Sequence, residues 1–338
     1  MSDVLPTQIT TPAERLETLT PPHSTRFSFP WFSFQPAVLR TILFVLFLFP
    51  FPKTANSATL KTETIKAWQE YVETANAQMQ EHLIPGHPFL FSDSDEDQAS
   101  ATKLRTGEIL VSPVGPHIPK RVPSGLIHDW NGEVFIPNST LHDVLPVVRD
   151  YNCYKAVYQP AVIDSKTIAA ESSPVSPVTE DQFYMLLMNK SLIAKTALDS
   201  DFRSSYVRVT DQRWYSVSES TRIQEIAGYG TEGQHMLPED EGTGLIWKTY
   251  SITRFEERDG GVYIELEAIV LSRDIPFLLR YVVSPIVRRV SREALMTSLH
   301  QTQEAVRSAK LPAKLEDHLA ATRPCSTGAT PVAATGKH

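Results

Sequence analysis

The side chains of this chain that could carry acid–base chemistry are few and lie far apart in the sequence. His128 and Asp129 are adjacent in a strand-like stretch, and His235 follows Glu232 in a glycine-rich loop. Successive residues of a strand point to opposite faces of a sheet, so His128 and Asp129 are not expected to act as a pair. No Ser/His/Asp or Cys/His arrangement is visible as a motif, and we assign no catalytic residue.

Metal-binding patterns are incomplete. The acidic stretch from Ser92 to Ser100 begins like a calcium loop, but Gln98 stands where the loop needs glycine and Leu104 where it needs a bidentate glutamate. The only two cysteines, Cys153 and Cys325, lack the spacing of a zinc site. One lies in the predicted domain and the other in a tail, so we expect no disulfide between them. We predict neither a metal nor another cofactor.

The composition is that of a globular protein that does not bind nucleic acid. The chain has 338 residues, of which 41% are hydrophobic and 21% are charged, so it has material for a substantial core. Its formal net charge is -7, whereas nucleic-acid binding needs a basic surface that neutralises phosphates. The sequence does not determine an oligomeric state.

Residues 1–58 have the pattern of a targeting segment. After Arg40, the apolar run from Thr41 to Phe51 has the length of a signal-peptide core and is shorter than the roughly 20 residues that cross a membrane. Small residues up to Ala58 suit a signal peptidase, so we expect a periplasmic or secreted protein whose mature chain starts near Ala58. The alternative is an uncleaved anchor that contacts a membrane and leaves the domain facing outside the cytoplasm.

The next part of the chain predicts a helix, a connector and a strand. Apolar residues at three- and four-residue steps predict a helix from Thr59 to Leu83. Closely spaced prolines make the segment up to residue 123 an extended connector. The stretch Gly125–Pro137 predicts a strand, which Asn131 and Gly132 could bend into a hairpin because both residues tolerate positive φ.

The second half predicts a short helix, many strands and a helical end. The short helix is expected from Asn138 or Ser139 to about Tyr151. Stretches rich in β-branched and aromatic residues predict strands near Lys155–Ile168, Gln182–Asn189, Leu192–Leu198, Ser205–Thr210, Arg213–Ile226, Gly244–Glu256 and Gly261–Ser272. Two helices are expected at the end, Pro276–Val290 and Ser291–Ala309, followed by a disordered tail.

This order of elements predicts an α+β protein with a helix-grip fold. In that fold a curved antiparallel sheet wraps around a long C-terminal helix; here an extra N-terminal helix is added. We expect four regions: residues 1–58 as signal peptide or anchor with a disordered leader, 59–123 as the helix and connector, 124–309 as the ligand-binding domain, and 310–338 as the tail.

Several segments of the second half are similar to one known superfamily. They are Gly125–Trp130, Phe135–Pro137, Asp150–Asn152, Tyr158–Pro160, Val162–Ser165, Gly244–Lys248, Arg254–Phe255, Gly261–Glu265 and Leu271–Pro276. Together they resemble the START-like (SRPBCC) superfamily, and in particular a branch of exported bacterial proteins. The resemblance covers about Ser124–Ala309 and implies an internal cavity for a lipid or another hydrophobic small molecule. Because the superfamily also contains polyketide cyclases and hydroxylase subunits, it does not by itself define an activity.

Seven residues are expected to bind that ligand. Polar groups on strands would orient it, and large or small apolar groups would form the walls. The predicted ligand-binding residues are Arg222, Trp247, Tyr250, Arg254, Ala268, Phe277 and Tyr281. Arg254 could instead form a cross-strand ion pair with Glu265 or Glu267 on the outside of the sheet, and we favour that alternative because the other face of this strand is apolar.

Three functions are compatible with these residues. The one that we favour is an exported binding or carrier protein for a hydrophobic small molecule, with the loop Gly228–Gly242 near the cavity entrance. The second is a cavity enzyme of the cyclase or hydrolase kind that uses His235, Tyr250 or a carboxylate as general acid or base. The third is a structural module whose interior is filled by its own side chains.

Overall fold

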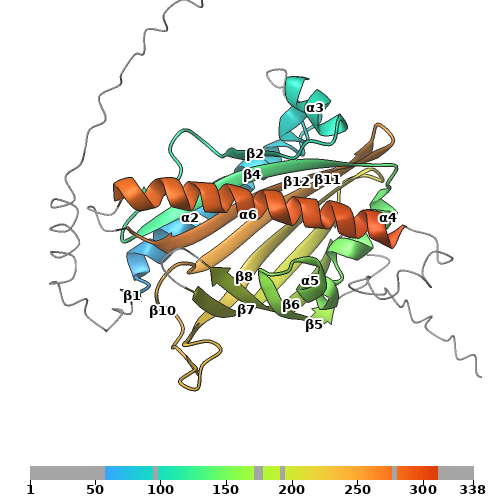
Figure 1. Ribbon diagram of the computed structural model, residues 1–338. Helices are drawn as coiled ribbons and strands as arrows, with labels where there is room; N and C mark the ends of the chain where they lie inside the picture. The colour runs from blue at the N-terminus through green and yellow to red at the C-terminus, as the bar shows by residue number, and fades with distance from the viewer. Residues whose placement is uncertain (1–57, 94–97, 171–177, 191–194, 276–279, 311–338) are drawn as a thin grey trace, which may run out of the picture. The chain divides into compact units, whose positions relative to one another are not determined.

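A ten-stranded antiparallel sheet organises the protein (Figure 1). Along the sheet the strand order is β2-β4-β12-β11-β8-β7-β6-β5, with β3 paired to β4 and β9 paired to β8. The strands are β2 (Leu110–Pro113), β3 (Lys120–Val122), β4 (Gly125–Pro137), β5 (Val162–Ala170), β6 (Val178–Lys190), β7 (Lys195–Arg208), β8 (Arg213–Ala227), β9 (His235–Met236), β11 (Lys248–Arg258) and β12 (Gly261–Arg273). A separate two-stranded sheet pairs β1 (Ala58–Thr59) with β10 (Glu241–Gly242).

The helices come before, between and after these strands. They are α2 (Thr62–Glu81), η1 (Phe91–Asp93), α3 (Gln98–Arg105), α4 (Leu141–Val148), η3 (Tyr151–Cys153), α5 (Tyr154–Val157) and α6 (Arg280–Ala309). The computed structural model describes residues 58–93, 98–170, 178–190, 195–275 and 280–310, all of which belong to one compact unit. The expected leader, the expected tail and Phe277 lie outside the described residues.

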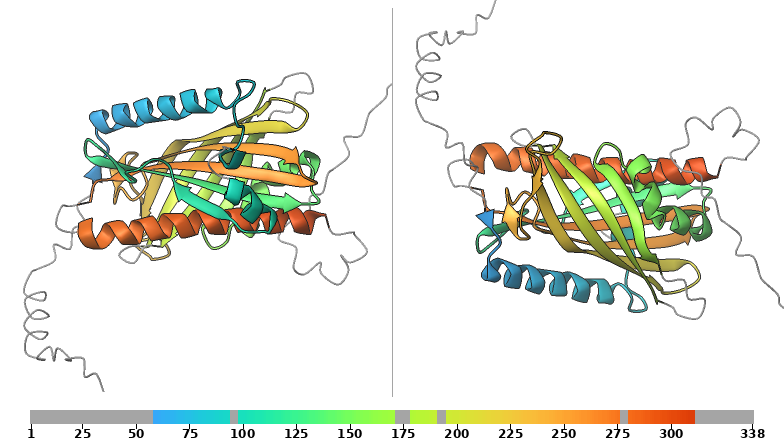
Figure 2. Two further views of the ribbon diagram at one scale, coloured as in Figure 1. Left: turned by 90° about the horizontal axis from the view of Figure 1, so that it is seen from above. Right: turned by 90° about the horizontal axis from the view of Figure 1, so that it is seen from below.

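The sheet is covered on both faces by helices. Figure 2 shows α2 and α6 on opposite sides of it. We call the face toward α6 the inner face and the face toward α2 the outer face. On the outer face, Trp68, Ala75 and Met79 of α2 pack in one hydrophobic cluster with β11 and β12. On the inner face, Leu295 and Leu299 of α6 pack in another cluster with β4 and β12.

The strand order and the closing helix α6 confirm the predicted helix-grip fold. The early helix is also confirmed, and its apolar stripe is buried because it packs on the outer face. Among the described helices, none combines the length and apolar character needed to cross a membrane.

The predicted bend at Asn131 and Gly132 is wrong, because β4 runs unbroken from Gly125 to Pro137. The glycine serves a different purpose. A Cβ atom on Gly132 would lie 2.6 Å from Cδ1 of Leu299 and 3.0 Å from Cγ of Leu295. The missing side chain therefore lets α6 approach the strand closely.

Two helix predictions also need correction. The C-terminal helices form a single helix, α6, which contains Pro285 near its N-terminal end; a proline there removes one backbone hydrogen bond without ending the helix. The short helix α4 begins after Thr140, one residue later than the expected cap. Thr140 and Asp143 form a reciprocal capping box that satisfies the free N–H groups of the first turn.

Cys153 corrects a third prediction. It is buried in η3 and is disulfide-bonded, and its partner lies outside the described residues.

Leu299→Ala is expected to lower the free energy of unfolding by about 2–5 kcal/mol, since it removes buried methyl groups and leaves a cavity against Gly132. The Leu299 side chain is 1% exposed. Urea unfolding of the purified protein measures the change. The neighbouring variant His300→Ala, at an exposed position, should stay within about 0.5 kcal/mol of the wild type. A similarly small loss for Leu299→Ala would contradict the packing described above.

Candidate functional site

A row of small side chains crosses the inner face of the sheet. Each residue of this row is the cross-strand partner of the next. The row crosses six strands, from Trp130 through Ala268, Ser251, Ser218 and Ser204 to Asp181. The four middle residues are alanine or serine. Small side chains at the centre of a sheet fill less of the volume above it than large side chains do. We call these four residues, Ala268, Ser251, Ser218 and Ser204, the trough.

Solvent reaches the inner face at this level. Leu266, Ala268 and Val270 are half-buried, although β12 is flanked on both sides by β4 and β11. The outer-face residues Ile269 and Leu271 of the same strand are 0% exposed. The accessible surface of the three residues therefore lies on the inner side.

The covering helix is packed unevenly. In its second half, Leu295, Leu299 and Val306 are buried against the sheet. In its first half, Ile286 and Val287 are only half-buried, and Tyr281 and Val290 are exposed. The second half lies over the Pro137 end of β4, because the Gln303 amide donates to the Phe135 carbonyl. The first half of the helix therefore continues toward the Gly125 end of β4, where the inner-face residues of the neighbouring strand β12 are partly exposed.

Ala268 is the one described strand residue of the predicted binding set that faces α6 and not α2. It lies on the inner face, between Trp130 and Ser251 on the flanking strands. Tyr281 is 85% exposed and so differs from the expected cavity wall. The first turn of α6 directs it to solvent, a direction that the sequence did not reveal.

Trp247 and Tyr250 belong to the outer core instead. Both are buried in the cluster under α2, and the Tyr250 hydroxyl donates to Asn76 of that helix at 2.7 Å. Arg222 also faces outward, where it forms ion pairs with Asp199 and Asp201. The alternation of side chains along β8 explains the position of Arg222. The inner-face residues of this strand are Ser216, Ser218 and Ser220, and the bulge before Arg222 turns that side chain to the outer face.

Arg254 forms the expected alternative, a cross-strand ion pair with Glu265 on the outer face. The pair is buried rather than exposed, because the segment before α3 covers it. Glu265 also accepts a hydrogen bond from the Phe91 backbone N–H at 2.6 Å. Next to it, Glu133 accepts from the Ser92 hydroxyl at 2.7 Å. These contacts attach the segment around η1 to the sheet.

The outer face therefore holds several carboxyl groups away from water. Burial raises the pKa of Asp129 to about 6, although a hydrogen bond from the Tyr71 hydroxyl opposes this shift. Burial, with the nearby Asp129 charge, raises the pKa of Glu267 to about 7. Burial and the nearby Glu265 also raise the pKa of Glu133. In the described residues, no group of three or more His, Cys, Asp or Glu side chains is arranged to hold a metal.

The small inner-face residues were missed by the sequence interpretation, although a signal for them exists. Ser216, Ser218 and Ser220 alternate with larger residues, and so do Thr249, Ser251 and Thr253. A period of two in small hydroxyl residues on two strands marks one polar face of a sheet. The predicted binding residues were mostly charged and aromatic instead, because the chemistry of such side chains is easier to recognise in a sequence.

One pair on the inner face has the residue types of an acid–base site. The Nε2 atom of His128 lies 2.9 Å from the Ser272 hydroxyl. Asp129 points to the other face and contacts Tyr71, as strand alternation predicted. Burial lowers the pKa of His128 to about 4, so the imidazole is neutral at pH 7 and a weak base. His235, the other candidate, is exposed in a loop whose strand β9 pairs with β8.

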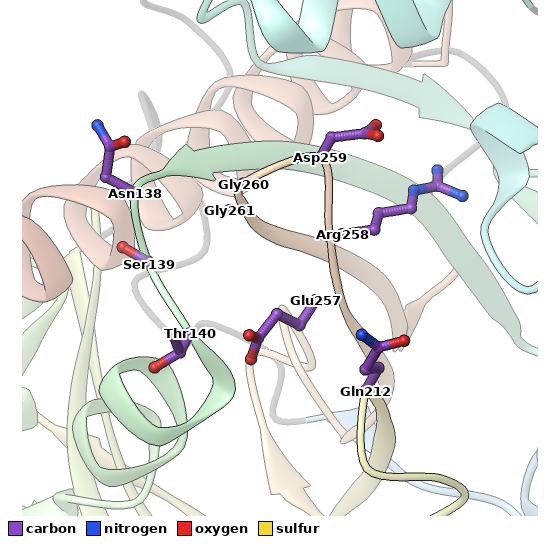
Figure 3. Close-up of a pocket in the computed structure, with 9 residues that line it drawn as sticks. All are labelled: Asn138, Ser139, Thr140, Gln212, Glu257, Arg258, Asp259, Gly260 and Gly261. Atoms are coloured by element: carbon purple, nitrogen blue, oxygen red, sulfur yellow. The ribbon is translucent and has the colours of Figure 1, made fainter.

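A polar pocket of 380 Å³ lies elsewhere, at the turn between β11 and β12. It is lined by Asn138, Ser139, Thr140, Gln212, Glu257, Arg258, Asp259, Gly260 and Gly261. Figure 3 shows Glu257 turned toward the start of α4, where it accepts the Leu141 N–H at 2.7 Å. Arg258 forms an ion pair with Asp93. These two contacts join the β11–β12 turn to α4 and to η1. The pocket is therefore a junction between structural elements.

No protein-family model and no curated protein matches this chain. Among solved structures, a STAR-related lipid transfer protein from Xanthomonas axonopodis has 16% identity and a TM-score of 0.37 over 58% of this chain and 98% of that chain. Human STARD10 has 12% identity and a TM-score of 0.36 over 68% of this chain and 86% of that chain. The di-domain ARO/CYC StfQ from the steffimycin biosynthetic pathway has 13% identity and a TM-score of 0.31 over 54% and 51% of the two chains.

START proteins, which the sequence resembles, are thus among the similar solved structures. The helix-grip fold itself is established by the strand order and the closing helix of this chain.

Glu267→Gln is expected to stabilise the protein more at pH 9 than at pH 5. The pKa of Glu267 is about 7 in the folded protein, against an ordinary value of 4.5. The unfolded chain therefore loses this proton first, and the wild type loses stability as pH rises through that interval. A neutral glutamine lacks this loss, so the gain should be roughly 1–3 kcal/mol at pH 9 and smaller at pH 5.

Urea unfolding at the two pH values measures this difference. Glu73→Gln, at an exposed position on α2, is the matched control and should show no pH-dependent gain. Equal gains for Glu267→Gln at both pH values would show that Glu267 does not keep its proton in the folded protein.

Proposed function

We propose that this protein binds and carries a hydrophobic small molecule between the inner face of the sheet and the first half of α6. The observation that supports this proposal is the accessibility of Leu266, Ala268 and Val270 in the middle of a covered sheet. A protein that only needed a filled core would place larger side chains here, since natural interiors are close-packed. The trough leaves room for another molecule.

A cavity enzyme is the second candidate, and the contact between His128 and Ser272 favours it. The carrier is preferred for two reasons. The low pKa of His128 makes it a weak base near neutral pH, and no described carboxylate contacts the pair. Hydrolysis of a p-nitrophenyl ester that is lost in Ser272→Ala would favour the enzyme instead.

We further propose that the protein is exported. The short apolar run Thr41–Phe51 and the small residues after it support a signal peptide. The disulfide at Cys153 supports the same conclusion, because disulfides persist mainly in oxidising compartments outside the cytoplasm.

Ala268→Trp is expected to abolish binding of a hydrophobic probe, because the indole would occupy the trough beside Trp130 and Ser251. The purified wild type should bind a pyrene-labelled twelve-carbon alcohol at micromolar concentration, about -8 kcal/mol. Fluorescence titration measures the affinity, and circular dichroism checks the fold.

Ile168→Trp is the matched control, since it adds the same ring at a site that is 53% exposed on β5. It should bind like the wild type. If a folded Ala268→Trp variant keeps the wild-type affinity, the ligand does not occupy this space.

If the protein is exported, cleavage of the leader lowers the intact mass of the chain, and this mass can be measured. Expression of the full chain in a secretion-competent bacterial host should yield a soluble extracytoplasmic protein whose intact mass corresponds to a start near Ala58. Recovery of the full-length chain in the membrane fraction would support the anchor alternative.

A further inference from the structure

Ser251, Thr253 and Ser216 carry hydroxyl groups on the inner face that are free to bind another molecule. Ser251 and Thr253 lie on β11, and Thr253 is paired across the sheet with Ser216 of β8. None of the three hydroxyls makes a hydrogen bond within the described residues, and none is enclosed among the unpartnered buried atoms. Each of these hydroxyl oxygens therefore keeps some exposed surface on the inner face.

The serines beside them on β8 and β7 are hydrogen-bonded within the sheet. The Ser220 hydroxyl contacts the Thr249 backbone, donating to its carbonyl and accepting from its N–H. Ser204 and Ser218 bond to each other. The free hydroxyls are thus a distinct group at and beside the centre of the trough, and not a general property of serine on this sheet.

One end of the trough presents a buried donor. Trp130 is 8% exposed, and its indole N–H has no partner in the described protein. It lies on the inner face next to Ala268. A buried donor without an acceptor costs free energy, and an acceptor oxygen on a bound molecule would remove that cost.

The inner face lacks positive charge where the space lies. On the described strands β4, β12, β11 and β8, the inner-face positions between Leu126 and Ile136 and their cross-strand partners contain no lysine or arginine. At the far end of the trough, Asp181 is already bound by the Arg149 guanidinium and the Tyr151 hydroxyl. A carboxylate or phosphate bound against these strand positions would have no lysine or arginine of the strands beside it.

We infer that the ligand is a neutral amphiphile whose polar groups are hydroxyl or carbonyl oxygens, and that it lies across the strands along the trough. This inference rests on the proposed binding function. The trough spans four neighbouring strands, so it is roughly 14 Å long at the usual strand spacing. Uncharged oxygens on the ligand would accept from Trp130 and exchange hydrogen bonds with Thr253, Ser251 and Ser216.

Matched probes separate this inference from binding in general. Twelve-carbon chains labelled with pyrene can end in an alcohol, a carboxylate or a methyl group. At pH 7.5 the wild type should bind the alcohol at least tenfold more tightly than the carboxylate. Equal or tighter binding of the carboxylate would overturn the neutral-ligand inference while leaving the carrier function intact. No binding of any of the three probes would overturn both.

Thr253→Val tests the hydroxyl contact, because it keeps the shape of the side chain and removes the oxygen. It should weaken binding of the alcohol about fivefold and leave the methyl-ended probe unchanged. Thr221→Val, at an exposed position in the β8 bulge, is the matched control and should change neither. Equal effects on the alcohol and the methyl-ended probe would overturn the hydroxyl contact.

Ser251→Lys supplies the missing cation. In a variant that circular dichroism shows to be folded, the preference should reverse in favour of the carboxylate probe. An unchanged preference in that folded variant would mean that the probe head group does not lie at the trough. If this variant does not fold, the result for Thr253→Val decides the inference.

Discussion

The long pairing between β4 and β12 is the constraint on which the rest of the structure depends. It runs without interruption from Gly125 opposite Arg273 to Pro137 opposite Gly261. Because side chains alternate along each strand, this single register decides which residues face α6 and which face α2. A slip of one residue would place the charged residues of β12 under α6 and its apolar residues under α2.

The outer face shows how the chain accommodates polar groups inside a fold that is covered on both sides. Asp129, Glu133 and Glu265 are buried there, and each accepts a hydrogen bond from a segment that precedes the sheet in sequence. The N-terminal helix and η1 are thereby joined to the sheet by directed contacts in addition to apolar packing. Burial of these carboxyl groups has an electrostatic cost, which makes the outer face a structural layer whose stability depends on pH.

The inner face has the opposite character. The part of the inner face under the second half of α6 is a close-packed core, in which Gly132 allows Leu299 to approach β4. The part of the inner face near the first half of α6 carries small hydroxyl side chains, and that half of the helix is loosely packed. The same helix α6 therefore stabilises the fold at one end and covers the proposed binding space at the other. Under the proposed function, this division would let a ligand bind without weakening the core that holds the helix in place.

The sequence by itself determined the order of the main elements, the helical character of the C-terminal end of the domain and the opposite directions of His128 and Asp129, because these follow from local periodicity and strand alternation. That this end is one helix and not two was decided by the structure. It also contained the alternation of Ser216, Ser218 and Ser220, although not its meaning. Only the tertiary structure decided which face of the sheet each alternating set of side chains occupies. Tyr250 lies on the outer face under α2, Arg254 lies on the same face under the segment around η1, and Ala268 lies on the inner face. These positions depend on cross-strand register and packing, which are contacts between residues far apart in the chain.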